Sequence, residues 1–249
     1  ICAYLHDIGK QFIPQSILQK PSKLTDEEFE VMKTHTTIGY KICMNDLKLR
    51  PYAAGPLYHH EALNGTGYPQ GLTKKDIPYE GQIIRVADEY DAIVSKRQYK
   101  SHIGITDTIK ILIDNTKPFS NVDSSVAVRH LSENAKLGKD NPIIVKALIS
   151  VVIEDINYEI SCSLDYLSNL ESTIKRLKIA KDYNDKMLKA SNDKKRQYYF
   201  EGVKSYLAPE ENPENFENVL SEYVIAYDNK KAHIAHLQDE IKKIKKLRV

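Results

Sequence analysis

Apolar residues recur at intervals of three and four along most of the chain, which is the spacing of an amphipathic helix. Runs that alternate apolar and polar residues, which would predict strands, are almost absent. We therefore expect an all-α fold. The spacing predicts helices over residues 1–10, 25–43, 57–62, 79–95, 106–116, 123–135 and 141–156.

Capping residues mark where several of these helices begin and end. Thr25 is the expected N-cap of the second helix, and Glu28 completes a capping box with it. Gly9 is expected to stop the first helix. Further N-caps are expected at Thr106 or Asp107, at Asp123, and at Asn141 ahead of Pro142.

The pattern changes after about Ile156, where apolar residues take a heptad-like spacing and Lys and Glu fill much of the rest. Prolines in residues 208–215 predict a break within this region. The region is either an antiparallel helical hairpin or a helix that pairs with another subunit. We expect two domains, residues 1–156 and 157–249. His233 and His236 lie in the second and are interpreted as solvated side chains.

Composition excludes several classes of protein. The 249 residues carry 36 basic and 34 acidic side chains, whereas a protein that coats nucleic acid is strongly basic. Three scattered cysteines without a CxxC motif favour a reducing, cytoplasmic setting. The longest apolar run, residues 142–156, contains Lys146 and is too short to cross a bilayer, so we expect no membrane contact.

Four histidines and two aspartates in separate helical segments are the candidate chemistry. Taken singly, each has an ordinary structural explanation, such as a buried histidine held by a neighbouring group. Together their nitrogen and oxygen atoms suit Fe, Mn, Zn or Ni and do not suit a thiolate site. Six ligands exceed the need of one tetrahedral zinc and suit two metals that share a carboxylate, an arrangement that activates hydroxide for attack on a phosphoester. The six are His6, Asp7, His35, His59, His60 and Asp88.

The order of motifs around these residues resembles the HD-GYP family, cyclic di-GMP phosphodiesterases of the HD superfamily. The match runs from Ile1 to about Lys100, and more loosely to about Ile156, through the motifs HDIGK, KPSKLTDEEFEVMKTH, HHEALNGTGYPQGL, IIRVADEYDA and RQYK. The His-Asp pair of the HD motif is by itself a weak indicator of this family. The combination HHE-x4-GTGYP-x-GL is specific, because it fixes ligands and a turn together.

The resemblance implies a role for each matching residue. The six candidate ligands match the family's metal ligands, with Asp7 as the bridging carboxylate. Lys10 matches the lysine that reaches the substrate phosphate, which makes Asp7 and Lys10 the expected catalytic residues. Arg97 and Lys100 match the cations that hold the ligand's phosphates. Tyr68 matches the tyrosine of the GYP loop, which borders the substrate.

The family normally has a further metal-binding histidine upstream of HD, and some members add a glutamate there that recruits a third metal. This chain begins too late to include them, so the first helices of the HD bundle are expected to be missing. We expect two divalent ions, or three with that glutamate, with Fe or Mn ahead of Zn or Ni.

The implied activity is hydrolysis of cyclic di-GMP to pGpG, followed by a second cut to GMP. An upstream sensory or regulatory domain and a homodimer through the C-terminal helices are expected as partners. Two alternatives stay open. One is a weak or inactive module that binds cyclic di-GMP, and the other is a general HD nucleotide phosphohydrolase.

Overall fold

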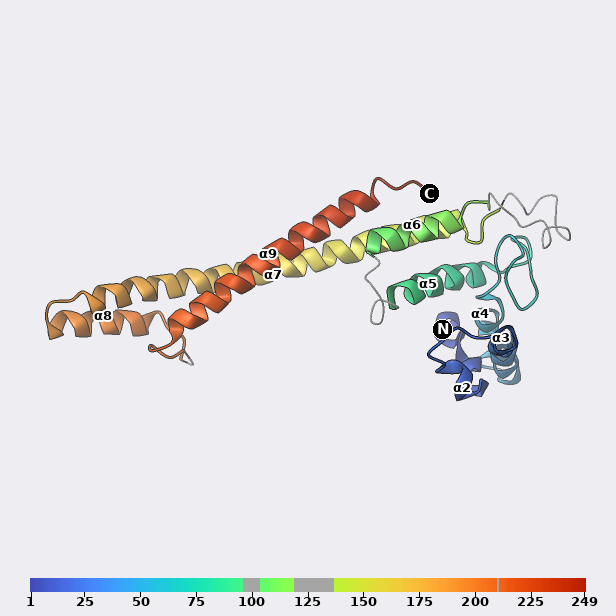
Figure 1. The fold of residues 1–249 in the computed structure, drawn as a ribbon, viewed down its shortest axis with the longest axis horizontal. Coiled ribbons are helices and arrows are strands. Elements are labelled where there is room, and N and C mark those ends of the chain that lie inside the picture. Colours follow the sequence, from blue (N-terminus) through green and yellow to red (C-terminus); the bar gives the residue numbers. More distant parts are fainter. Residues whose placement is uncertain (96–103, 119–136, 210) are drawn as a thin grey trace. The chain divides into compact units, whose positions relative to one another are not determined.

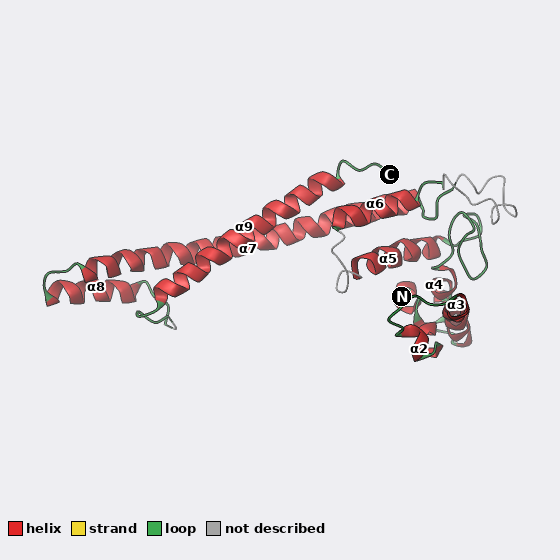
Figure 2. Ribbon diagram, viewed as in Figure 1, coloured by secondary structure: helices red, strands yellow, loops and turns green. Residues whose placement is uncertain are grey.

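The computed structural model describes residues 1–95, 104–118, 137–209 and 211–249. In these ranges all the secondary-structure elements are helices (Figure 2). The single isolated β-bridge in the same ranges joins Asn64 to Thr73. The all-α fold expected from the sequence is confirmed. No helix in the described ranges is both long and apolar enough to cross a membrane.

The chain divides into two compact units, and the first comprises Ile1–Val152 with Lys243–Val249. In this unit α3 packs against η1 and α4, α4 packs against α5, and α5 packs against α6 (Figure 1). These contacts bring together segments that carry the candidate ligands. The elements are α1 (Cys2–Leu5), η1 (Ile8–Phe12), α2 (Gln15–Leu18), α3 (Asp26–Asn45), η2 (Arg50–Tyr52), α4 (Ala54–Tyr58), α5 (Tyr79–Ser95), α6 (Ile105–Asn115) and the start of α7 (Pro142–Leu188).

The predicted capping box at the start of α3 is confirmed. The Thr25 hydroxyl accepts from the backbone N–H of Glu28 at 3.3 Å, and the Glu28 carboxylate accepts from the Thr25 N–H at 2.8 Å. These two bonds satisfy backbone donors that a helix leaves unpaired at its first turn. The cap therefore fixes where α3 begins, and with it the position of His35 ten residues along.

Three predicted helix ends were wrong. The first helix ends at Leu5, and Gly9 lies inside η1 instead of stopping α1. The helix predicted over residues 57–62 is α4, which ends at Tyr58. The N-cap of α6 is Gly104, and the helix begins at Ile105, two residues before the start that a Thr106 cap would give. The helix predicted over residues 123–135, with its cap Asp123, lies outside the described residues.

The second unit, Ile153–Lys242, is built from the later part of α7, α8 (Asp193–Ser205) and most of α9 (Phe216–Ile244). The predicted break falls between α8 and α9, whereas α8 itself was not predicted. A buried apolar cluster joins the three helices within this one chain. Its members are Ile174, Leu177 and Ala180 of α7, Val203 of α8, and Phe216 and Leu220 of α9.

In the second unit, polar side chains also connect α7 to the loop before α9 and to α9 itself. Arg176 donates to both carboxylate oxygens of Glu211 at 2.6 and 2.7 Å, and to the Tyr206 carbonyl at 2.6 Å, which ties the loop between α8 and α9 to α7. His233, interpreted from the sequence as solvated, lies 2.8 Å from the Glu159 carboxylate. The domain boundary expected at residue 156 stays a prediction.

Candidate metal centre and the adjoining pocket

The six candidate ligands lie in two overlapping groups that share Asp7. Asp7, His35, His59 and His60 form one group, and His6, Asp7 and Asp88 form the other; in each, the ligand atoms lie within 4.8 Å of one another. They come from the α1–η1 turn, α3, the residues after α4, and α5. Segments far apart in sequence thus converge on one carboxylate, whereas the ligand roles themselves stay a prediction.

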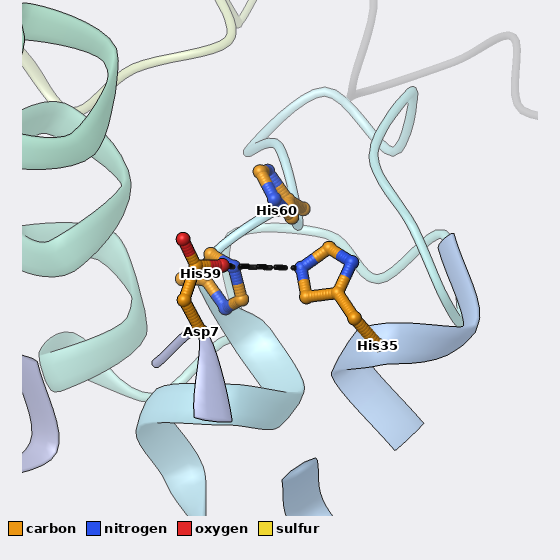
Figure 3. Close-up of side chains that lie close together, drawn as sticks. All are labelled: Asp7, His35, His59 and His60. Carbon is orange, nitrogen blue, oxygen red and sulfur yellow. Dashed lines mark hydrogen bonds and ion pairs between the residues drawn. The ribbon is translucent and has the colours of Figure 1, made fainter. Parts of the chain in front are cut away.

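In the first group His35 and His59 are buried, and the side chains of the group converge (Figure 3). Asp7 Oδ1 lies 3.5 Å from His35 Nε2 and 3.7 Å from His59 Nε2. The two Nε2 atoms are 3.2 Å apart. Both imidazoles are almost fully excluded from solvent, His35 at 1% exposed and His59 at 0%.

Backbone carbonyls set the tautomers of these rings. His35 Nδ1 lies 2.6 Å from the Met32 carbonyl, and His59 Nδ1 lies 3.0 Å from the carbonyls of Gly55 and Pro56. A carbonyl oxygen only accepts, so each Nδ1 carries a proton, and each ring turns its Nε2 toward Asp7. This is the arrangement by which a second group orients a metal-ligating histidine.

The first group fits a cation. Two Nε2 lone pairs that face each other at 3.2 Å repel unless a proton or a metal lies between them. Burial, as the main cause, lowers the pKa of His35, which disfavours the proton. Asp7 Oδ1 is buried and has no hydrogen-bond partner among the described residues, although a buried carboxylate oxygen ordinarily has one. A divalent ion would satisfy all three atoms.

His60 completes the first group, and its ring centroid lies 4.0 Å from that of His59. Burial, as the main cause, and the neighbouring His59 and His35 together lower the pKa of His60 to about 2. His60 is therefore neutral at pH 7, which is the form that binds a metal.

The second group is more open and more acidic. His6 Nε2 lies 3.3 Å from Asp7 Oδ2 and 3.6 Å from Asp88 Oδ1. Hydrogen bonds to Asp7 and Asp88 raise the pKa of His6 to about 10. Lys10 Nζ lies 2.5 Å from Asp7 Oδ2. Burial favours the neutral form of Asp7, but contacts with His59, His6 and Lys10 outweigh it and hold the pKa of Asp7 well below its usual range.

The loop after the histidine pair is held by Glu61, which is 1% exposed. Its two carboxylate oxygens accept from the backbone N–H groups of Gln70 at 2.7 Å and Leu72 at 2.8 Å. The sequence left open whether Glu61 orients an imidazole. The contacts show that it closes the loop instead, and charged acceptors make such bonds strong.

Two glycines let this loop form for different reasons. Gly65 has φ +79°, a conformation that residues with a side chain rarely adopt. At Gly67, where the sequence suggested the same freedom, the reason is space: a Cβ would lie 2.3 Å from the Ala62 nitrogen. The loop delivers Tyr68 to the centre. Its ring stacks on His60 with centroids 4.6 Å apart and planes 27° apart.

A partly buried polar network beside the centre was not predicted. Arg85 Nε donates to Asp140 at 2.7 Å, and Arg85 also lies 3.4 Å from the His60 carbonyl. Glu89, interpreted from the sequence as a surface or helix-packing group, accepts from Asn115 at 2.5 Å. Burial and then Asp140 raise the pKa of Glu89 to about 7. The i,i+4 spacing of Arg85 and Glu89 was the one signal of this network in the sequence.

A pocket of about 430 Å³ opens beside His60 and Tyr68, within the size range of ligand sites. Of the residues expected at the substrate, Tyr68 lines it, Lys10 does not, and Arg97 and Lys100 lie outside the described residues. Most of the other lining residues had no predicted role. The lining residues are Phe29, Lys33, His60, Ala62, Thr66, Gly67, Tyr68, Arg85 and Lys139.

Comparison with known protein families agrees with this geometry. A family model described as an HD domain matches residues 1–126, half of the chain, and the chain belongs to that family. The resemblance to the HD-GYP proteins within it is confirmed by relatives whose names include cyclic di-GMP phosphodiesterase.

The relatives match only part of the chain. The cyclic di-GMP phosphodiesterase of Thermotoga maritima is 54% identical over 101 residues, which are 40% of this chain and 27% of the relative. The cyclic di-GMP phosphodiesterase response regulator RpfG of Xanthomonas campestris pv. campestris is 46% identical over 102 residues, again 40% and 27%. The 3′3′-cGAMP-specific phosphodiesterase 2 of Vibrio cholerae is 42% identical over 98 residues, 39% and 19%. The chain thus spans about a quarter of the length of the first two.

Proposed function

We propose that the protein is a metal-dependent phosphodiesterase that hydrolyses cyclic di-GMP to pGpG, with GMP as the product of a second cut. Two lines support the proposal. The chain is similar to proteins named as cyclic di-GMP phosphodiesterases. The six candidate ligands form two groups that share Asp7, as expected for a two-metal phosphoesterase.

The observation that carries the proposal is the position of Asp7 between the two groups. One of its oxygens faces His35 and His59, and the other faces His6 and Lys10. A carboxylate with each oxygen directed at a separate set of ligands suits a bridge between two cations.

In this proposal each group holds one divalent ion, Fe or Mn ahead of Zn or Ni. Bound there, such ions supply Lewis-acid activation of water and charge neutralisation at the phosphate. Asp7 holds the two sites together. The Lys10 side chain is 39% exposed, so its ammonium can turn from Asp7 to a phosphate oxygen. Tyr68 borders the substrate, and Arg97 and Lys100 contact the second phosphate.

The test is turnover of cyclic di-GMP by the full chain with Mn²⁺ or Fe²⁺, with pGpG separated by chromatography. Asp7→Asn keeps the shape but removes the bridging charge, and we expect a loss of about 10³-fold or more in kcat. Asp114→Asn, on an exposed carboxylate of α6, is the matched control and is expected to retain activity. Absence of pGpG with either metal, or unchanged turnover in Asp7→Asn, would refute the proposal.

A second substrate is favoured by one observation, the similarity to a 3′3′-cGAMP-specific phosphodiesterase. Hydrolysis of cyclic di-GMP and 3′3′-cGAMP should therefore be compared in the same assay. Measuring hydrolysis of dGTP and ppGpp in the same assay tests the alternative that the protein is a general HD nucleotide phosphohydrolase. Tight binding of cyclic di-GMP without turnover would favour the binding module.

A further inference from the structure

The pocket beside the metal centre has walls of two different kinds. Its aromatic wall is Phe29 and Tyr68, whose ring centroids lie 6.0 Å apart with planes at 81°. Phe29 is 43% exposed although it is a large apolar residue, so a hydrophobic ring is open to the solvent beside the site. Aromatic faces of this kind stack on nucleobases.

Cationic side chains supply the rest of the chemistry. Lys33, Arg85 and Lys139 line the pocket, whereas none of the described lining residues is acidic. The Lys33 ammonium lies 4.9 Å from the centroid of Phe29 and 5.7 Å from that of Tyr68. A site that combines exposed rings with cations suits a flat ligand rich in hydrogen-bond acceptors.

Lys33 is the cation best able to respond to a ligand. Its ion pair is with Glu30, whose side chain is 69% exposed, and exposed pairs of this kind contribute little. Arg85, by contrast, is held at 2.7 Å by the fully buried Asp140. A base that enters over Phe29 would displace the Lys33 ammonium from the ring faces and meet it at the edge of the base.

We propose that this pocket is a base subsite selective for guanine, in which Phe29 and Tyr68 contact the base and Lys33 recognises its acceptor edge. The inference rests on the proposed function, because it identifies the half of a cyclic dinucleotide that binds beside His60. Guanine presents two acceptors, N7 and O6, on this edge, whereas adenine replaces O6 with an amino donor. An ammonium group only donates, so it favours guanine.

The test measures binding separately from hydrolysis. Phosphorothioate analogues of cyclic di-GMP and cyclic di-AMP, which resist hydrolysis, are titrated into the full chain with Mn²⁺ and followed by calorimetry. We expect cyclic di-GMP to bind about tenfold to a hundredfold more tightly, the discrimination typical of a good base contact. Equal affinity of the wild-type chain for both analogues, or no binding of either, would overturn the proposal.

Variants separate the two parts of the subsite. Lys33→Met should weaken binding of the cyclic di-GMP analogue about tenfold or more and leave binding of the cyclic di-AMP analogue unchanged. Lys33→Arg should retain the preference for the guanine-containing analogue. Phe29→Ala should weaken the binding of both analogues about tenfold, because every base has a face that can stack on an aromatic ring. Lys41→Met, on an exposed position of the same helix outside the pocket, is the control.

The outcomes are distinct. Equal weakening of both analogues by Lys33→Met would identify Lys33 as a phosphate contact and overturn guanine selection. Unchanged affinities in Phe29→Ala, with the helical circular dichroism of the wild type, would overturn the stacking role. Base preference without any turnover would refute the proposed function and leave the subsite standing.

Discussion

Asp7 and Glu61 are two buried or half-buried carboxylates near the same centre, and their contacts give them opposite roles. Asp7 has an oxygen without a hydrogen-bond partner in the described part of the chain, and histidine nitrogens surround it. Both oxygens of Glu61 accept backbone hydrogen bonds. A carboxylate with unused acceptor capacity suits a cation, whereas a satisfied one serves the fold.

Glu61→Gln tests the second role. An amide has one acceptor oxygen, so one of the N–H groups of Gln70 and Leu72 would face an N–H donor instead. We expect the free energy of unfolding to fall by about 1–3 kcal/mol, measured by urea denaturation. Glu222→Gln, at an exposed position of α9, should change it by less than about 0.5 kcal/mol. An unchanged stability in Glu61→Gln would contradict this role.

Element ends decide how the histidine pair is presented. Successive side chains of an α-helix point about 100° apart, which would separate His59 from His60. Because α4 ends at Tyr58, the two residues lie in the following turn, and their ring centroids are 4.0 Å apart. The helix predicted over residues 57–62 would not have placed both rings in one group.

The packing of η1 on α3 is the contact that joins Asp7 to His35. A Cβ on Gly9 would lie 1.9 Å from the His35 carbonyl oxygen and 2.7 Å from the Gly39 nitrogen, both in the backbone of α3. Gly9→Ala should therefore force the two elements apart. We expect a loss of more than about 3 kcal/mol in stability, together with loss of bound Mn²⁺ by elemental analysis.

Gln11→Ala is the control for this prediction, because Gln11 is an exposed residue of the same short helix. It should change the stability by less than about 0.5 kcal/mol and keep the metal. A Gly9→Ala variant that retains both stability and metal would show that the close packing of η1 on α3 is not required.

At the scale of the whole molecule, all the candidate ligands and the pocket lie in Ile1–Val152, and Ile153–Lys242 has its own apolar cluster. A ligand stabilises the folded unit that contains its site. The predicted domain division therefore has a measurable consequence, although α7 continues from one unit into the other.

Amide hydrogen exchange measures this consequence. Mn²⁺ at about 100 times its Kd should slow exchange in α3, α4 and α5 by up to about 100-fold, and leave α8 unchanged. In Asp7→Asn the metal should slow neither region. Equal slowing in both units would show that they unfold as one body and contradict the division.

Local signals in the sequence determined most of the longer helices, the capping box at Thr25, the break before α9 and the inventory of ligand types. Each depends on neighbouring residues, whose helical spacing or turn chemistry acts over a few positions. The motif HHE-x4-GTGYP-x-GL also indicated the family, because it combines ligands and a turn in one short stretch.

Only the tertiary structure decided which side chains meet. Arg85 pairs with Asp140 across 55 positions of sequence, and Lys33 of α3 reaches the ring of Tyr68 in the loop after α4. No periodicity encodes such contacts, because they depend on how separate helices pack. The role of Glu61, the orientation of the imidazoles and the pocket beside His60 follow from that packing, since backbone groups from several segments must be in place before those side chains have partners.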